Sequence, residues 1–299
     1  MQTLSVKKIN ASFVALDIFA KDIKLSHSIF AIPFVGVALT ITGVENISLT
    51  RLLQIVLCMV FARSFAMGIN RYLDRHIDSE NQRTKSRALP SGSISNKDYL
   101  GLTIGFGLLF IVMAFSLSKS AGFLSPFLLI VLGFYSLMKK ISWLTHWYLG
   151  LCLGLAPIAA EIALFDKVTL PIILIGVAVA FWTAGFDLLY SLQDRDFDAE
   201  KGLHSVPAKL GHKAAIWLSR ISFLAMIVAL TSVGVITNAR YFWFFGVMTV
   251  GLILVAEHWI IRDAMIKGTS DKINVAFFNL NAMVSVLFFL FALASSHYV

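Results

Sequence analysis

Residues 169–190 read TLPIILIGVAVAFWTAGFDLLY, a run in which Asp187 is the one charged side chain. About 20 mostly apolar residues are enough for an α-helix to cross the hydrocarbon core of a bilayer. A polar, acidic segment that begins at Ser191 follows the run directly. The stretch therefore predicts a transmembrane helix that carries a charged group near one end.

Stretches of the same character recur along the whole chain. Hydrophobic residues make up 58% of the 299 positions, charged residues make up 14%, and the mean hydropathy is +0.80. This balance points to lipid rather than water as the solvent. We predict an all-α, polytopic membrane protein with nine spans at residues 26–44, 51–70, 100–118, 121–138, 147–165, 169–190, 214–236, 241–261 and 274–295. No Pro/Ser-rich linker interrupts residues 26–299, so we expect one helical domain there.

Residues 1–25 differ from the rest because charges alternate with apolar side chains such as Phe13 and Ile18. This pattern favours an amphipathic helix lying on the membrane surface, with a frayed tail as the alternative. We interpret residues 1–25 as a cytoplasmic or interfacial segment.

The positions of Lys and Arg predict the orientation of the spans, because cytoplasmic loops carry an excess of both. One side holds Lys7, Lys8, Lys21, Lys24, Arg71, Arg75, Arg83, Lys85, Arg87, Lys97, Lys139, Lys140, Arg195, Lys201, Lys209, Lys213, Arg262, Lys267 and Lys272. The other holds Arg51, Lys119, Lys167 and Arg240. The amino terminus is then cytoplasmic, as are the two long polar connections, 71–99 and 191–213. This topology explains the net charge of +8, and we expect no nucleic-acid partner.

The first polar connection opens with an acidic cluster. Asn70, Asp74 and Asp78 recur at every fourth position, which aligns three oxygen ligands along one helix face. Such hard ligands suit Mg²⁺, which completes its shell with water and substrate phosphate. The cationic side chains of Arg83, Lys85 and Arg87 follow and could clamp phosphate oxygens.

The second connection repeats the pattern. Asp194 and Asp198 are four residues apart at the end of a long apolar stretch, and Asp187 lies two turns earlier on a similar face. An ionisable group inside a span is costly, which marks Asp187 as a site candidate. One such cluster alone is typical of a solvated helix end. Two on the same side of the membrane, each followed by a cation and a glycine, favour metal–diphosphate binding across a shared cavity.

These clusters resemble a known family. Asn70–Asp78 with the trailing NQRTKSRALPSG of residues 81–92 is similar to the first signature of the UbiA superfamily of intramembrane prenyltransferases, and Tyr190–Gly202 is similar to the second. The segment Tyr135–Lys140 resembles the YPxxKR element of that family. Here the proline is missing, and Lys140 replaces the usual arginine, which keeps the charge and loses the planar fork.

The resemblance implies a nine-helix fold and a site with two Mg²⁺ ions. Asn70, Asp74 and Asp78 would hold one ion, Asp194 and Asp198 the other, and both ions would bridge the diphosphate of a polyprenyl donor. The four aspartates are the expected catalytic residues. The expected diphosphate- or substrate-binding residues are Arg63, Asn70, Arg83, Arg87, Lys139, Lys140, Asp187, Tyr190 and Lys201. An aromatic acid would accept the prenyl group.

Further stretches, 26–34, 63–71, 202–208 and 263–289, look like the branch labelled 4-hydroxybenzoate polyprenyltransferase. That branch includes enzymes of the futalosine menaquinone route, which prenylate a dihydroxynaphthoate, so both acceptors stay open. The resemblance places the protein in the inner membrane of a bacterium, with a cytoplasmic active site.

Several groups inside the spans have two interpretations. Arg63 is expected to point into the cavity, with an internal salt bridge as the alternative. For Glu161 a structural hydrogen bond competes with catalysis. Glu257 and His258 could form a general base, although a satisfied interfacial pair is favoured. Gly150 and Gly154 predict close helix packing.

Two other functions also use acidic residues within the membrane. A CDP-alcohol phosphotransferase would need a DGxxAR element, which the sequence lacks. A membrane transporter with an acidic cytoplasmic vestibule is the remaining alternative, but transporters place such charges near the bilayer midplane.

Overall fold

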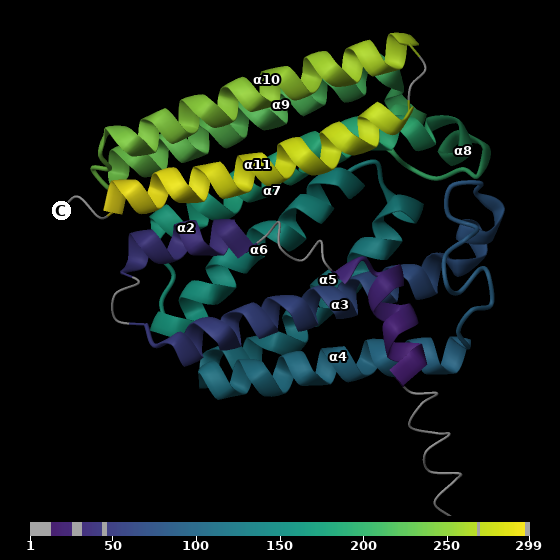
Figure 1. The fold of residues 1–299 in the computed structure, drawn as a ribbon, viewed down its shortest axis with the longest axis horizontal. Helices are drawn as coiled ribbons and strands as arrows, with labels where there is room; N and C mark the ends of the chain where they lie inside the picture. Colours follow the sequence, from purple (N-terminus) through teal and green to yellow (C-terminus); the bar gives the residue numbers. More distant parts are fainter. Residues whose placement is uncertain (1–12, 26–31, 44–46, 268–269, 297–299) are drawn as a thin grey trace, which may run out of the picture. The chain divides into compact units, whose positions relative to one another are not determined.

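A computed structural model of the chain describes residues 13–25, 32–43, 47–267 and 270–296, and for 262–278 it describes the backbone without the side chains. All regular elements in that range are helical (Figure 1). They are residues 13–22, α2 (Ile32–Thr42), α3 (Leu49–Glu80), α4 (Asn96–Leu117), α5 (Lys119–Ile141), α6 (Thr145–Phe165), α7 (Leu170–Tyr190), the 3₁₀ turn η3 (Ser191–Asp194), α8 (Arg195–Glu200), α9 (Val206–Ile236), α10 (Tyr241–Lys267) and α11 (Ser270–Ser296).

Eight of these helical segments are long and apolar enough to cross a membrane. They match the predicted spans from 51–70 onward, so the prediction of an all-α, polytopic membrane protein is confirmed. The predicted span 26–44 corresponds to α2, an apolar helix of 11 residues, and part of that span lies outside the described residues. Large apolar side chains such as Phe127 and Val112, both 67% exposed, cover outer surfaces, as lipid-facing helices require.

Helices extend into both long polar connections, beyond the spans that hydropathy predicted. Helix α3 continues to Glu80, so the first connection shrinks to residues 81–95. The second contains η3, α8 and the first turn of α9, which bends at Gly211. Hydropathy missed these segments because they are helices that continue beyond the apolar stretches, with polar side chains.

The described residues divide into two compact units. Those up to residue 28 and from 50 to 137 form the first unit, and those from 29 to 49 and from 138 onward form the second. Helix α5 therefore begins in the first unit and ends in the second.

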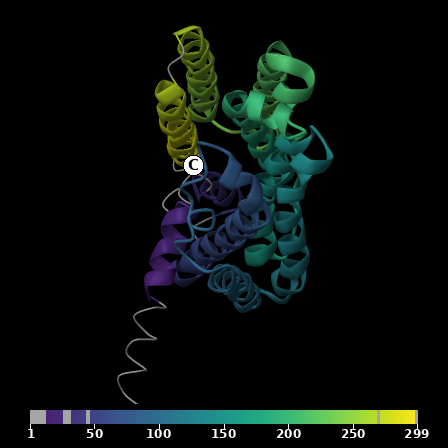
Figure 2. The ribbon, with the colours of Figure 1, turned by 90° about the vertical axis from the view of Figure 1, so that its right-hand side faces the viewer.

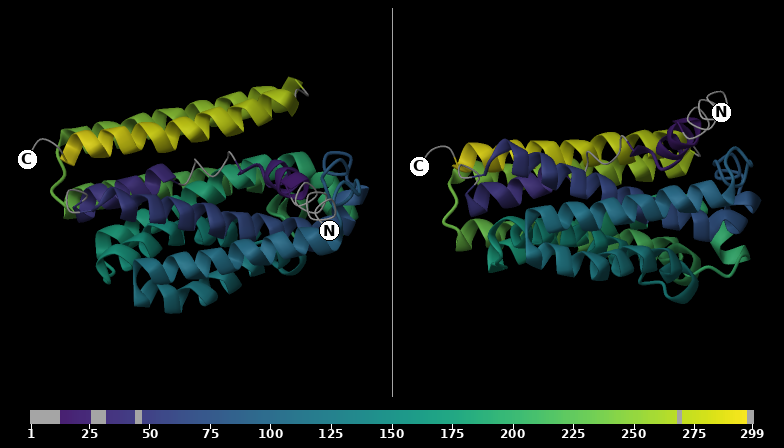
Figure 3. Two further views of the ribbon diagram at one scale, coloured as in Figure 1. Left: turned by 60° about the horizontal axis from the view of Figure 1, so that its bottom comes forward. Right: turned by 90° about the horizontal axis from the view of Figure 1, so that it is seen from below.

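In the first unit, α3 and α4 run side by side (Figure 3). Small residues allow this approach, since a Cβ atom on Gly68 would collide with the side chain of Thr103. The helix at residues 13–22 is anchored to the same unit by Phe19 and Ile23, both fully buried. Phe13 at the start of that helix is 66% exposed, so the predicted amphipathic character is present. Its position on a membrane surface stays a prediction.

Polar bonds also hold this N-terminal helix. One carboxylate oxygen of Asp22 accepts a hydrogen bond from the backbone N–H of Ala88 at 2.8 Å, and the other accepts from the Tyr99 hydroxyl at 2.7 Å. Asp22 thereby joins the helix to the connection that follows α3 and to α4. These contacts give residues 13–25 a fixed place in the first unit, and residues 1–12 of the predicted segment lie outside the described residues.

In the second unit, α7 packs between α6 and α9, while α10 lies along α11 (Figures 1 and 2). Gly150 and Gly154 of α6 meet the backbone carbonyls of Ala180 and Gly176, so the prediction of close packing is confirmed. Across α7 and α9, the Ser219 hydroxyl donates to the carbonyl of Gly185 at 2.7 Å. Small residues and interhelical hydrogen bonds take the place of the hydrophobic effect that lipid cannot supply.

Glu161 has a structural role at the end of α6. Its carboxylate accepts hydrogen bonds from the backbone N–H of Thr169 at 2.9 Å and from the Thr169 hydroxyl at 2.8 Å. Thr169 is the N-cap residue of α7, where an anion is stabilised by the positive end of the helix dipole. The interpretation of Glu161 as a structural hydrogen-bonding group is therefore confirmed.

Candidate functional site

The first acidic cluster lies on the continuous helix α3, as its spacing predicted. The Asn70 amide nitrogen donates to an Asp74 carboxylate oxygen at 2.9 Å, so these two side chains converge one turn apart. The Asn70 amide oxygen is also engaged, because Arg71 donates to it at 3.0 Å. The helix thus presents a row of oxygen-bearing groups held in place by their neighbours.

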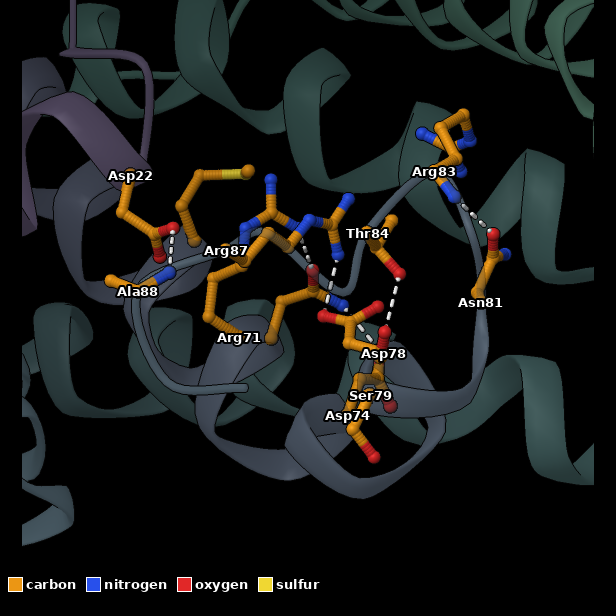
Figure 4. A network of polar contacts seen from close by, with 12 residues as sticks. Asp22, Arg71, Asp74, Asp78, Ser79, Asn81, Arg83, Thr84, Arg87 and Ala88 are labelled. Carbon is orange, nitrogen blue, oxygen red and sulfur yellow. Dashed lines mark hydrogen bonds and ion pairs between the residues drawn. The ribbon is translucent and has the colours of Figure 1, made fainter. Parts of the chain in front are cut away.

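Asp78 is tied to the connection that follows its helix. Arg87 forms an ion pair with the Asp78 carboxylate at 2.6 Å, and the two side chains are only 21% and 10% exposed. The hydroxyl of the buried Thr84 donates to the backbone carbonyl of Asp78 at 3.0 Å. Figure 4 shows that the connection folds back over the end of α3, which brings Arg87 to the carboxylate. The predicted proximity of Arg87 to the acidic face is therefore present.

Arg71 was not predicted as a site residue, yet it lies at the centre of this cluster. It is buried, and its Nε atom has no hydrogen-bond partner among the described residues. The pKa of Arg87 is lowered mainly by burial and, to a smaller extent, by the positive charge of Arg71. The same two causes lower the pKa of Lys24. Several cations thus gather around few carboxylates, which suits an anionic ligand. The sequence signal was its position directly after Asn70.

Arg63 contacts the backbone that follows the N-terminal helix. Its Nη1 atom donates to the backbone carbonyls of Ile23 and Lys24, each at 3.3 Å. These carbonyls follow the helix at residues 13–22, where a cation is favourable. Arg63 therefore fastens the N-terminal helix to α3, and its role toward substrate stays a prediction.

Arg83 lies at the exposed edge of the first unit. Its backbone N–H donates to the side-chain oxygen of Asn81 at 2.9 Å, which shapes the turn after α3. Gly92, near the end of the connection, has φ +73°, a conformation that side-chain-bearing residues rarely adopt. The trailing glycine of the first motif is thus explained by backbone geometry.

The second acidic cluster is built differently. Helix α7 gives way to the η3 turn at Ser191, and Asp198 belongs to the short α8. A 3₁₀ turn therefore separates Asp187 from Asp198, and the prediction that Asp187 lies on a face similar to that of Asp194 stays a prediction. The change of helix type alters the angular spacing of side chains, and no sequence pattern marks it.

Asp198 is fully buried, and Lys139 from the end of α5 lies 2.7 Å from one of its carboxylate oxygens. Among the described residues, neither carboxylate oxygen of Asp198 has a hydrogen bond of good geometry. The ion pair with Lys139 therefore offsets the cost of burying the negative charge of Asp198. The backbone N–H of His204 donates to the Lys139 carbonyl at 2.7 Å, which fixes the segment after α8 against α5. Lys139, an expected diphosphate-binding residue, thus lies at the second motif, and its contact with a diphosphate stays a prediction.

Asp187 contacts a residue that the sequence analysis missed. The Nδ1 atom of His146, in the first turn of α6, lies 2.7 Å from an Asp187 carboxylate oxygen. The other ring nitrogen, Nε2, accepts the backbone N–H of Val206 at 3.3 Å. His146 sits alone in the sequence at the start of an apolar stretch, so no motif marked it.

The remaining predicted residues of the second unit lie around the same end of α7. Tyr190 is its last residue and is half-buried, as is Asp194 at the end of η3, whereas Lys140 and Lys201 are exposed. Gly202 follows Lys201 with φ +67°, matching the geometry of Gly92 in the first motif. Their contact with a diphosphate stays a prediction.

Glu257 and His258 do not form an interfacial pair. Glu257 is fully buried and accepts a hydrogen bond from the Asn281 amide at 3.0 Å, and Asn281 in turn accepts from the Trp182 indole at 2.9 Å. His258 contacts the Leu254 carbonyl of its own helix at 3.2 Å. Glu257 belongs to a polar connection among α7, α10 and α11.

The two acidic clusters belong to different units, and their predicted convergence on one cavity stays a prediction. Among the side chains that the structure describes, no three from His, Cys, Asp and Glu gather closely enough to hold a metal ion. The donor set still fits Mg²⁺, because amide and carboxylate oxygens are its preferred ligands and few of them come from protein. The buried oxygens of Asp198 that lack hydrogen bonds also suit a cation.

Comparison with known proteins agrees with this architecture. The model of the UbiA prenyltransferase family matches residues 30–283. A 4-hydroxybenzoate octaprenyltransferase of Aliivibrio fischeri is 30% identical over 213 residues, 71% of this chain and 74% of that protein. A protein of the same name from Yersinia pseudotuberculosis is 29% identical over 239 residues, 79% of this chain and 81% of that protein.

Solved structures share the fold. A UbiA homologue from Aeropyrum pernix superimposes with a TM-score of 0.79 at 26% identity, covering 90% of this chain and 98% of that one. A UbiA homologue from Archaeoglobus fulgidus, solved with DMAPP and Mg²⁺, has a TM-score of 0.69 at 19% identity, covering 94% and 99%.

The fold and the aspartate-bearing helix ends define an integral membrane prenyltransferase. The chain belongs to the UbiA prenyltransferase family. This membership favours an enzyme over the transporter hypothesis.

Proposed function

We propose that the protein transfers a polyprenyl group from polyprenyl diphosphate to the ring of an aromatic acid, of the 4-hydroxybenzoate or 1,4-dihydroxy-6-naphthoate type, in ubiquinone or menaquinone biosynthesis. The observation that carries the proposal is the face of α3, where Asn70 and Asp74 converge and Asp78 is paired with Arg87. The names of the relatives support a hydroxybenzoate-type acceptor, and the Archaeoglobus structure supports a prenyl diphosphate donor with Mg²⁺.

In this proposal Asn70, Asp74 and Asp78 hold one Mg²⁺, and Asp194 and Asp198 hold the other. Bound Mg²⁺ supplies neutralisation of the charge on the diphosphate. Arg87 and Lys139 already sit beside carboxylates of the two clusters. Each cation is therefore placed to contact phosphate oxygens that the metal ions would hold near those carboxylates.

The side chains stabilise the departing diphosphate as the bond between the allylic carbon and its oxygen breaks and the electron pair stays on oxygen. A ring carbon of the acceptor then forms a bond to the allylic carbon, and the ring loses a proton to restore aromaticity. Apolar side chains would keep water from the allylic cation, and two of them are buried at the second motif: Leu192 within it and Val206 just after it.

We place the protein in the inner membrane of a bacterium, with its amino terminus and active site cytoplasmic. The distribution of Lys and Arg supports this orientation. Cysteine substitutions at Lys85 and Arg240, labelled with an impermeant thiol reagent in intact cells, test it. The orientation predicts labelling at position 240 and protection at position 85.

The function is tested in membranes that contain the protein, a polyprenyl diphosphate and Mg²⁺, with each acid supplied separately. Prenylated product should form with one acid, disappear with EDTA and return when Mg²⁺ is added in excess. Membranes from cells that lack the protein are the control. Absence of product with both acids would refute the proposed acceptor class.

A further inference from the structure

The His146–Asp187 pair lies in the second unit beside the second acidic motif, and the proposed mechanism gives His146 no task. The imidazole is 2% exposed, whereas the Asp187 side chain keeps 24% of its surface exposed. Of the two, Asp187 is therefore the group that a bound molecule would touch. The buried His146 contacts the Asp187 carboxylate from the protein interior.

The two contacts of the ring define its tautomer. The backbone N–H of Val206 can only donate, so Nε2 must accept and carries no hydrogen. The proton is then on Nδ1, which donates to the Asp187 carboxylate. A carboxylate oriented by a buried N–H donor has one preferred position, as in the outer-shell partners that fix ligating or catalytic groups.

The contact with Val206 gives the ring a second function. Val206 is the first residue of α9, whose opening N–H groups have no partner within the helix. The N-cap Ser205 accepts from Ala208 at 3.4 Å, and His146 satisfies the N–H of Val206. His146 thus connects Asp187 on α7 with the start of α9, the helix that follows the second motif.

We propose that His146 is a positioning residue of the prenyl transfer site, which fixes the carboxylate of Asp187 through Nδ1–H and anchors it to the start of α9 through Nε2. This inference rests on the proposed function. It adds a residue from α6 to the second acidic motif, to which the end of α5 and the segment from α7 to α9 also contribute.

Two conservative substitutions separate the contacts. The amide nitrogen of asparagine is as many bonds from Cα as Nδ1, so His146→Asn keeps a donor for Asp187 and loses the acceptor for Val206. The terminal atoms of glutamine match Nε2, so His146→Gln keeps the acceptor for Val206 and loses the donor for Asp187. We expect kcat/KM of His146→Asn to stay within about threefold of the parent value. For His146→Gln we expect kcat/KM to be about tenfold lower, because this variant loses the oriented hydrogen bond to Asp187.

Thermal unfolding in detergent gives the complementary readout. The midpoint should fall for His146→Asn, which leaves the N–H of Val206 unpaired, and stay near the parent value for His146→Gln. His212→Gln, at a partly exposed position of α9 outside the site, is the matched control and should leave both quantities unchanged. If activity instead followed stability in both variants, His146 would be purely structural and the inference would fail.

A double-mutant cycle closes the test. If His146 acts through Asp187, the variant that combines His146→Gln with Asp187→Asn should be no less active than Asp187→Asn alone. Losses that multiply would overturn the inference, because the two residues would then act independently. A parent protein inactive with every acid would instead count against the proposed function, which keeps the two failures distinct.

Discussion

The two acidic motifs share the spacing DxxxD, but the molecule builds them in different ways. In the first unit Asp74 and Asp78 extend from an uninterrupted helix, and the cation that pairs with Asp78 comes from nine residues further along. In the second unit the α-helix changes to a 3₁₀ turn at Ser191, and the cation beside Asp198 comes from the end of α5. The first motif is thus largely a local structure, whereas the second depends on packing between distant segments.

The largest expected effect tests whether the two motifs serve one reaction. Asp74→Ala and Asp194→Ala should each lower prenyl transfer by at least about a hundredfold, because each removes charge stabilisation of the diphosphate. Product formation under saturating Mg²⁺ measures this, with Asp196→Ala as the control since Asp196 is 91% exposed on the same segment. A loss in one variant only would show that the motifs are not equivalent.

The next effect tests the difference in burial. Lys139→Met leaves the fully buried Asp198 without its ion-pair partner and should lower the free energy of unfolding by about 3 kcal/mol. Arg87→Met should cost about 1 to 2 kcal/mol, because Asp78 keeps some exposure to water. Denaturant titration in detergent measures both.

Adding Asp198→Asn to Lys139→Met provides the control, since neutralising the stranded carboxylate should recover part of the stability. Equal costs in the two single variants would mean that the motifs do not differ in their dependence on burial.

The smallest expected effect concerns the glycine with positive φ that follows each motif. Gly92→Ala and Gly202→Ala should each cost about 1 kcal/mol, because both glycines have positive φ and a Cβ atom at either position would meet no neighbour within 4 Å. Gly101→Ala, in the interior of α4 with open space around it, should instead leave stability equal or higher. A marked difference between Gly92→Ala and Gly202→Ala would indicate that one turn carries additional strain.

Much of the site was predictable from spacing. Asn70, Asp74 and Asp78 share a helix whose period matches theirs, and Arg87 is close enough in sequence to fold back onto them. His146 was not predictable, since it lies 41 residues from Asp187 and 60 from Val206. Arg71 was overlooked because a cation next to an acidic motif usually indicates a solvated surface, and here it is buried.

By itself the sequence determined that the chain is a helical membrane protein and which oxygen-bearing side chains line the end of α3. Hydropathy and helical periodicity are local properties of the sequence. In lipid, the backbone N–H and C=O groups must also form their hydrogen bonds within the protein, which favours helices. Only the tertiary structure decided where α7 changes to a 3₁₀ turn, which cation pairs with the buried Asp198, and which ring orients Asp187. Those outcomes depend on contacts between segments far apart in the chain, and each buried charge must find its partner there.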